Sequence, residues 1–268
     1  MDPTQMPGRT PAPRAFEFTE VAGHQLEYYW TRPVVAGETA LIFLHEGLGS
    51  ASLWRDFPAA VTNATGYPAL VYSRYGYGGS DVFREPRGVD YMHHEALDVL
   101  PALRAKLAIG DTVLIGHSDG ASIALIHAGA GRWPVRALAL EAAHVFVEDE
   151  SVSGIEAARV AFETTDLPQK LARHHADSDK TFFGWNDIWL DPAFRAWNIE
   201  SYLASIDCPS LVMQGEDDEY GTNAQVAAIR DQVAGPVETR MLAACGHSPH
   251  RDQTDLTLDA IAGFIKNL

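Results

Sequence analysis

The chain has 268 residues, of which 46% are hydrophobic, and its 36 acidic and 20 basic side chains give a formal net charge of −16. This length and composition are typical of one large globular domain, or of one domain that carries an insertion. The acidic excess argues against nucleic acid and anionic membrane surfaces as partners, because both repel a negatively charged protein.

The N-terminal residues and the two cysteines bear on the compartment. Residues 1–15 are rich in proline and lack the apolar stretch of a signal peptide, so we expect a flexible tail there. Cys208 and Cys245 are too few for a disulfide framework and suit a reducing environment. Because no apolar run reaches membrane-spanning length, the sequence predicts a cytoplasmic protein.

Strand and helix patterns alternate along the chain after a predicted β-hairpin in residues 16–31, which turns at Ala22-Gly23. Continuous apolar runs, typical of strands buried on both faces of a parallel sheet, occupy residues 39–47, 68–76, 111–118, 135–144, 209–218 and 237–247. Helical patterns lie at roughly 51–63, 90–108, 119–130, 223–234 and 251–267. The alternation predicts an α/β fold with a mostly parallel, doubly wound sheet, whose functional residues gather at the carboxyl ends of the strands.

One interval breaks this alternation, because residues 147–207 contain helical patterns rich in Trp and Phe but no strand pattern. A plain crossover connection needs far fewer residues. We therefore predict a helical cap over residues 147–207, inserted after the sixth strand and lying over the strand ends. The predicted core then consists of residues 16–146 and 208–268.

A G-x-S-x-G pattern, formed by Gly116, Ser118 and Gly120, lies where a predicted strand meets a predicted helix. Glycines on either side of a sharp strand-to-helix turn relieve the crowding of the serine and leave its hydroxyl exposed. The helix that begins there directs its free N–H groups and positive dipole end toward a developing oxyanion. The pattern therefore predicts a nucleophilic serine.

A serine nucleophile needs a base, usually a histidine, and a carboxylate that orients the base. His247 stands just past the last predicted strand. Four carboxylates follow the strand before it: Glu216, Asp217, Asp218 and Glu219. Glu141, on an earlier strand, is an alternative acid.

"GHSDG" (116–120), "GEDD" (215–218) and the final "GH" (246–247) resemble the α/β-hydrolase superfamily, and the resemblance extends from about Phe16 to the C-terminus. It implies that Ser118 is the nucleophile and His247 the base. The family's acid turn reads G-x-x-D, so counting from Gly215 assigns the acid to Asp218. The predicted insertion falls where this family carries its cap.

The stretch "LHEGLGS" (44–50) resembles the family's oxyanion loop, which implies that the backbone N–H groups of Gly47 and Asp119 hold the oxyanion. Two residues depart from the usual pattern. Glu46 stands where glycine is common, and its charge would oppose an oxyanion unless it is paired; we expect Arg74 as the partner. Asp119 follows the nucleophile where an uncharged residue is more usual.

Several other side chains are candidates for the site. Leu48, His144, Trp185 and Trp189 are predicted to line the substrate pocket. We expect a structural hydrogen-bonding role for His45 and packing under the serine turn for His117. The clusters His93-His94-Glu95 and His174-His175 lack metal-ligand spacing, so no metal site is expected. The sequence has no nucleotide-binding pattern, so no cofactor is indicated.

Together these residues predict a serine hydrolase that cleaves a small carboxylic ester, lactone or related acyl compound through an acyl-enzyme. The same triad also serves a carbon–carbon bond hydrolase of a diketone and a cofactor-free perhydrolase. A third alternative is a ligand-binding protein that keeps the fold with little turnover. The expected partner is a small acyl substrate, with neither nucleic acid nor membrane, for a monomer or homodimer.

Overall fold

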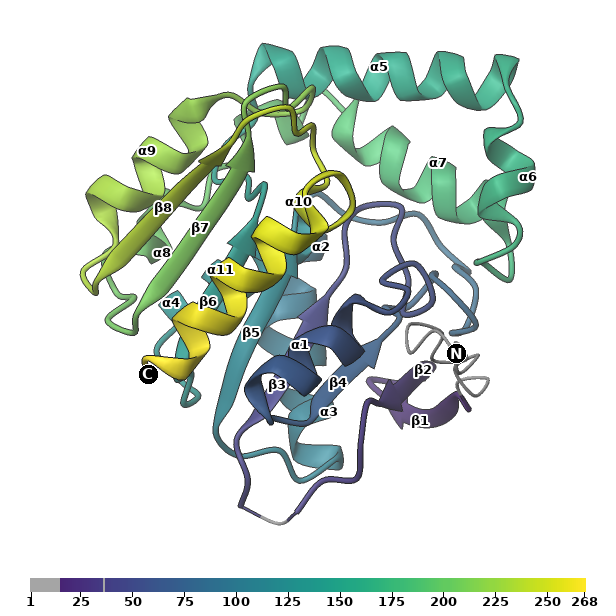
Figure 1. Ribbon diagram of the computed structural model, residues 1–268. Coiled ribbons are helices and arrows are strands. Elements are labelled where there is room, and N and C mark those ends of the chain that lie inside the picture. The colour runs from purple at the N-terminus through teal and green to yellow at the C-terminus, as the bar shows by residue number, and fades with distance from the viewer. Residues whose placement is uncertain (1–14, 36) are drawn as a thin grey trace, which may run out of the picture.

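The computed structural model describes residues 15–35 and 37–268 of the chain (Figure 1). Residues 1–14, which make up nearly all of the predicted flexible tail, lie outside the described residues. Within the described part, no helix is both long and apolar enough to cross a membrane.

A single sheet organises the described residues, with its strands in the order β1-β2-β4-β3-β5-β6-β7-β8. β1 and β2 form the predicted hairpin, β2 pairs antiparallel with β4, and every other pair of neighbours is parallel. The strands are β1 (Glu17–Val21), β2 (His24–Trp30), β3 (Ala40–Leu44), β4 (Ala69–Tyr72), β5 (Thr112–His117), β6 (Ala137–Glu141), β7 (Ser210–Gly215) and β8 (Val237–Leu242).

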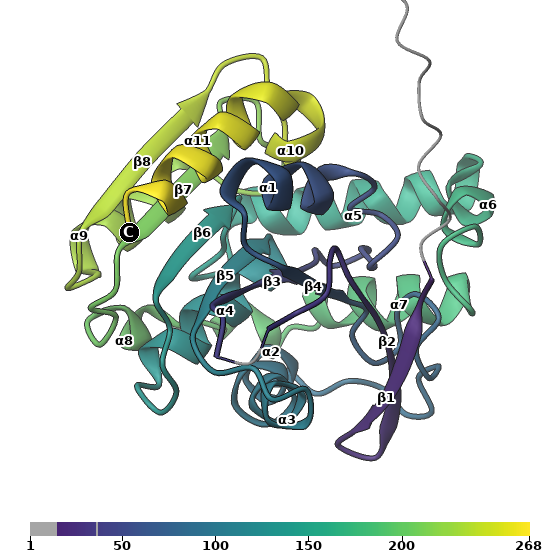
Figure 2. The same ribbon diagram turned by 60° about the horizontal axis from the view of Figure 1, so that its bottom comes forward.

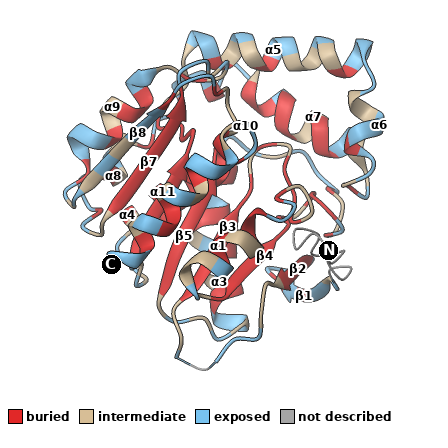
Figure 3. Cartoon of the chain, viewed as in Figure 1, coloured by how far each residue is buried: buried red, intermediate tan, exposed pale blue. Residues whose placement is uncertain are grey.

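Helices cover both faces of this sheet, which explains why the strands from β3 to β7 are buried at every position and mostly apolar (Figure 3). α1 and α11 pack on one face, and α3 and α4 pack on the other (Figure 2). The helices outside the insertion are α1 (Phe57–Thr65), α2 (Tyr91–His94), the π-helix η1 (Glu95–Val99), α3 (Leu100–Lys106), α4 (Asp119–Gly129), α9 (Asn223–Gln232), α10 (Pro249–Asp252) and α11 (Thr254–Lys266).

The insertion after β6 is helical, and α5 and α7 extend across the carboxyl-terminal edge of the sheet (Figure 1). Its helices are α5 (Asp149–Thr164), α6 (Leu167–Leu171), α7 (Ser178–Trp189), the 3-10 helix η2 (Phe194–Ala196) and α8 (Glu200–Leu203). Stacked Phe162 and Phe182 join α5 to α7. The predicted fold class, a mostly parallel doubly wound sheet with helices inserted after the sixth strand, is confirmed.

Two helix boundaries differ from the sequence prediction. The helix expected from residue 51 begins only at Phe57, because residues 51–56 form turns in which Arg55 has a φ of 49°. A proline in the first turn then fits the start of α1, where a missing N–H costs nothing. The helix expected over 251–267 is divided into α10 and α11 at Gln253, whose φ of −132° is not helical.

Gly120 allows the first turn of α4 to contact the end of β3. A Cβ atom at Gly120 would lie 1.9 Å from the carbonyl oxygen of Leu44, a backbone atom that cannot move aside. We therefore expect Gly120→Ala to lower the free energy of unfolding by at least about 1–3 kcal/mol, measured by urea denaturation. Gly263→Ala is the control, since nothing lies near its Cβ position and a helix interior favours alanine by about 1 kcal/mol. Equal stability of Gly120→Ala and the parent chain would contradict this reading of the contact.

Candidate active site

Ser118 occupies a strained turn between β5 and α4. Its φ of 53° and ψ of −118° lie in a region that residues with a side chain rarely adopt. The turn fits because both neighbouring glycines approach backbone closely: a Cβ at Gly116 would lie 2.5 Å from the carbonyl oxygen of Gly120. The strained turn therefore holds the Ser118 hydroxyl at the carboxyl end of β5.

The structure brings Ser118, His247 and Asp218 together in one chain of hydrogen bonds. His247, in the loop between β8 and α10, places its Nε2 2.9 Å from Ser118 Oγ. Its Nδ1 lies 2.8 Å from Asp218 Oδ1, in the loop after β7. Because an ionised carboxylate only accepts, Nδ1 carries the proton and Nε2 is left to accept from the serine hydroxyl.

Asp218 is set apart from its acidic neighbours by burial. Its side chain is only 2% exposed, and its Oδ1 also accepts the backbone N–H of Tyr220 at 2.9 Å. Burial acts to raise the pKa of Asp218, but the hydrogen bond and charge of His247 outweigh it and lower that pKa below its ordinary value. Asp217 is exposed, so of these two adjacent residues only Asp218 faces the imidazole.

Two further hydrogen bonds fix the backbone of His247. His117 Nε2 donates to the His247 carbonyl oxygen at 2.6 Å, and the His247 N–H donates to Glu219 Oε2 at 3.2 Å. His117 is fully buried beneath the serine turn, as predicted. The imidazole of His247 is therefore held both by its ring nitrogens and by its main chain.

Gly47 and Asp119, whose backbone N–H groups were predicted to hold the oxyanion, both lie next to Ser118: Gly47 lines the same cavity, and Asp119 follows Ser118 in the chain. Gly47 follows β3, while Asp119 is the first residue of α4, where the N–H groups have no partner within the helix. Among the described residues, neither N–H group donates to a protein acceptor. Trp185 of the cap covers Gly47 so closely that a Cβ there would lie 2.0 Å from the indole Nε1.

The sequence profile described as "Alpha/beta hydrolase family" matches residues 41–260, which is most of the chain. The chain belongs to this family. No curated protein matches the chain.

Solved structures with a similar fold include VinJ, which is 22% identical over 96% of this chain and 100% of that one, with a TM-score of 0.70. The thermophilic esterase from Thermogutta terrifontis is 17% identical, covers 96% and 99% of the two chains, and has a TM-score of 0.66. The CarC enzyme, a serine hydrolase involved in carbazole degradation, is 16% identical, covers 95% and 100%, and has a TM-score of 0.70. At these identities the likeness establishes the shared fold alone.

In this member of the alpha/beta hydrolase family, the expected pairing of the Glu46 carboxylate with Arg74 is wrong. The carboxylate instead lies 3.5 Å from His117 Nδ1 and 3.3 Å from Arg251 Nη2. Burial acts to raise the pKa of Glu46, but His117, Arg251 and His250 hold it well below its usual range. Arg74 contacts Glu46 only through the backbone, donating from Nη2 to the carbonyl oxygen at 3.1 Å, because the side chain of Glu46 turns away from Arg74.

The Arg74 side chain forms its ion pair with the carboxylate of Asp119. Arg74 Nη2 lies 3.6 Å from Asp119 Oδ2, and both side chains are fully buried. The hydroxyl of Tyr91, on α2, donates to the same oxygen at 2.8 Å. The Tyr91 hydroxyl in turn accepts from the indole Nε1 of Trp189 at 3.1 Å, so this network reaches the cap.

The alternative acid, Glu141, lies in a separate buried pair. Its Oε2 accepts from the His250 Nδ1 at 2.8 Å and from the His250 N–H at 2.9 Å. The predicted hydrogen-bonding role of His45 is also visible: Nδ1 donates to the Glu46 carbonyl at 2.8 Å, and Nε2 accepts the Arg74 N–H at 3.1 Å.

A cavity of about 200 Å³ opens beside Ser118 and His247. All four predicted pocket residues, Leu48, His144, Trp185 and Trp189, line it. Sequence reasoning missed several others, namely Ser151 and Ile155 of α5, Glu219 and Tyr220 beside the acid, and Ser248 and Arg251 beside His247. Adjacency to the predicted triad could have indicated the last four, whereas the two on α5 depend on how the cap lies.

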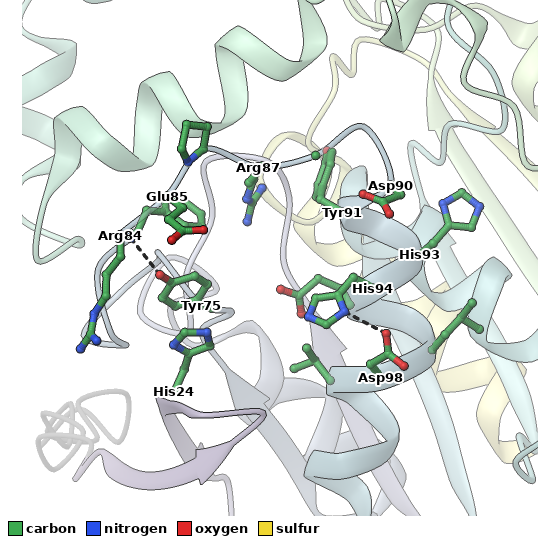
Figure 4. Close-up of a pocket in the computed structure, with 16 residues that line it drawn as sticks. His24, Tyr75, Arg84, Glu85, Arg87, Asp90, Tyr91, His93, His94 and Asp98 are labelled. Carbon is green, nitrogen blue, oxygen red and sulfur yellow. Dashed lines mark hydrogen bonds and ion pairs between the residues drawn. The ribbon is translucent and has the colours of Figure 1, made fainter.

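A larger cavity, of about 680 Å³, lies away from the triad (Figure 4). The segment before α2 contributes Arg84 and Arg87 to its lining, and β2 contributes His24. Its lining mixes carboxylates, guanidinium groups and imidazoles. Tyr91, which also lines it, is the link to Asp119.

The histidines of the two clusters have separate hydrogen-bond partners. His94 pairs with Asp98 at 2.8 Å on the surface, and His174 Nδ1 lies 2.8 Å from Ser52 Oγ. His175 of the cap joins two core loops, because its Nε2 donates to the Leu48 carbonyl at 3.0 Å and its Nδ1 accepts the Gly78 N–H at 3.0 Å. In residues 15–35 and 37–268, no group of three or more His, Cys, Asp or Glu is placed to hold a metal ion.

His144 is a buried neutral imidazole, and its burial predicts a pH dependence of stability. Burial, with the nearby ring of His247, lowers the pKa of His144 to about 3. The unfolded chain therefore binds this proton near pH 6.5 and the folded chain does not, so stability falls as the pH drops below about 6.5.

We expect His144→Phe to make this fall shallower by about 1.4 kcal/mol per unit of pH between pH 6 and pH 4.5, measured by urea unfolding. Ile155→Val, at a buried apolar residue that lines the same cavity and does not titrate, serves as the control and should keep the slope of the parent chain. An unchanged slope in His144→Phe would show that this imidazole takes up a proton in the folded state.

Proposed function

We propose that this protein is a serine hydrolase that cleaves a small carboxylic ester, lactone or related acyl compound. The observation that carries the proposal is the hydrogen-bonded chain from Ser118 through His247 to Asp218, built on a strained turn that places Ser118 in the lining of the cavity. A serine hydroxyl is a weak nucleophile without a neighbouring base, and this arrangement supplies one. The similar fold of an esterase and of a serine hydrolase is consistent with this chemistry.

In the proposed reaction, His247 Nε2 takes the hydroxyl proton while Ser118 Oγ attacks the acyl carbon. The tetrahedral intermediate collapses when His247 returns the proton to the leaving oxygen, which departs as an alcohol and leaves the acyl group on Ser118. Water, deprotonated by His247, then attacks the acyl carbon. The second tetrahedral intermediate expels Ser118 Oγ, which takes the proton back from His247 as the carboxylic acid leaves. Asp218 stabilises the imidazolium that forms in each step and keeps Nδ1 protonated.

The negative charge of the intermediate falls on the former carbonyl oxygen, which in this proposal accepts from the N–H groups of Gly47 and Asp119. Both donors belong to the main chain, so they need no reorganisation during the reaction. Each such donor contributes a few kcal/mol in related acyl-transfer sites, about 2.7–4 kcal/mol in one measured case.

The cavity supports a small substrate. Its volume of about 200 Å³ is below the 300–1,000 Å³ of pockets that hold drug-sized ligands. Leu48, Ile155, Trp185 and Trp189 give it apolar surface for an acyl or alcohol group. Glu46, Glu219 and Arg251 add charged groups to the lining.

Covalent labelling tests the nucleophile directly. The parent chain should react with a fluorophosphonate probe, detected by intact-protein mass spectrometry, and should hydrolyse p-nitrophenyl acetate. Ser118→Ala should not label and should lose kcat/KM by about 10⁴-fold or more, with unchanged circular dichroism, because the hydroxyl fills no core volume. A folded parent chain that neither labels nor turns over the ester would favour the ligand-binding alternative.

Paired variants test the acid. Asp218→Asn can offer an amide N–H to His247 and favour the wrong tautomer, a change that costs about 10⁴ in kcat in a serine protease. We expect a loss of that order with the fold retained. Asp217→Asn is the matched control, and its exposed carboxylate should alter kcat less than about tenfold. If Asp217→Asn causes the large loss of kcat instead, the acid is Asp217. If both variants lose less than about tenfold, the acid lies outside this turn.

A further inference from the structure

We propose that Arg74 is a positioning residue that aligns both oxyanion donors, Gly47 and Asp119, from behind the site. This inference rests on the proposed function, because it concerns how that site is held in place. Arg74 lies in the loop after β4, is fully buried, and does not line the cavity beside Ser118. It therefore acts through other groups and not on the substrate.

The first link runs to the peptide that carries the Gly47 N–H. Arg74 Nη1 donates to the carbonyl oxygen of His45, and Nη2 donates to that of Glu46 at 3.1 Å. The Glu46 carbonyl and the Gly47 N–H belong to the same planar peptide unit, so holding the oxygen sets the direction of the N–H. A charged donor on the carbonyl also polarises the peptide and strengthens the opposite N–H as a donor.

The same carbonyl oxygen has further donors, which shows that this peptide is fixed from several directions. His45 Nδ1 donates to it at 2.8 Å, and the N–H of Gly49 donates at 3.1 Å. The main chain of Arg74 supports His45 in turn, by donating its N–H to Nε2 at 3.1 Å. Arg74 thus contacts the oxyanion loop through its side chain directly and through its backbone by way of His45.

The second link runs to the residue that carries the other donor. Arg74 Nη2 lies 3.6 Å from Asp119 Oδ2, and Tyr91 holds the same oxygen. Without Arg74, a fully buried carboxylate would lie one residue from Ser118 and oppose the negative charge that develops there. The guanidinium both neutralises this carboxylate and restrains the first residue of α4.

The experiment compares substrate turnover with the binding of a mimic of the charged intermediate. The mimic is a trifluoromethyl ketone analogue of the ester, since attack by Ser118 turns its carbonyl oxygen into an oxyanion. We expect Arg74→Lys to lower kcat about tenfold to hundredfold, because lysine keeps the charge but cannot reach both carbonyl oxygens and the carboxylate together. The ketone should bind more weakly by a similar factor, while KM changes less than about threefold.

A second variant covers the case in which Arg74→Lys does not fold. Arg74→Gln combined with Asp119→Asn removes both partners of the buried pair, and so avoids the unpaired charge that destabilises single changes. It should fold and still lose kcat and ketone affinity by at least tenfold, because the guanidinium no longer holds the Glu46 carbonyl.

The matched control is Arg104→Lys. Arg104 is another buried arginine that donates to carbonyl oxygens, those of Gly110 and Pro134, but it lies far from the cavity. It should lower the melting temperature and leave kcat and ketone affinity within about threefold.

Three results would overturn the inference. If the parent chain is active and the folded Arg74 variants keep both kcat and ketone affinity, the positioning role alone is refuted. The same conclusion follows if kcat falls in these variants but their affinity for the ketone does not. A parent chain that neither hydrolyses the ester nor binds the ketone would refute the proposed function, and this inference with it.

Discussion

The arrangement of the site depends on one close approach of backbone to backbone, where the first turn of α4 meets the end of β3. Gly120 permits it, because any side chain there would collide with the Leu44 carbonyl oxygen. The contact places the loop after β3 beside the strained turn at Ser118. Gly47, which is distant in the sequence, thereby comes to line the same cavity as Ser118.

Four buried or partly buried carboxylates near the site each have a basic partner, in a chain that is already strongly acidic. Asp218 meets His247, Glu141 meets His250, and Glu46 lies between His117 and Arg251. Asp119 meets Arg74. Such pairs repay a large desolvation cost only when their geometry is good, so replacing one partner is expected to cost more than replacing both.

Much of the fold could be predicted from the sequence, because parallel strands buried on both faces leave continuous apolar runs and because glycine at the serine turn marks a strand-to-helix junction. The residues of the triad were predicted as well, from their order along the chain and from the G-x-x-D count, and the structure brings them within hydrogen-bonding distance. Their catalytic roles stay predictions.

The partners of buried charges could not be predicted in the same way. Arg74 and Glu46 both leave the carboxyl ends of neighbouring strands, which suggested a pair, but pairing depends on the direction in which each loop turns its side chain. The Glu46 carboxylate lies over Gly49, where a Cβ would come within 2.2 Å of Oε2, and this turns it away from Arg74. Likewise, α1 begins later than predicted because residues 51–56 form turns, which the apolar pattern of these residues did not indicate.

His175 has a consequence for how the cap and core move relative to each other. One neutral ring donates to the Leu48 loop and accepts from the Gly78 loop, and burial lowers its pKa to about 4, so both hydrogen bonds persist at neutral pH. These two hydrogen bonds attach the cap to the core just after α6, and a rigid-body rotation of the whole cap would have to break both of them. The opposite end of the cap is held as well, because Ser151 Oγ of α5 donates to the Tyr220 carbonyl oxygen at 2.7 Å and Glu148 Oε2 accepts the Thr222 N–H at 2.9 Å, so the cap is attached to the core at both ends.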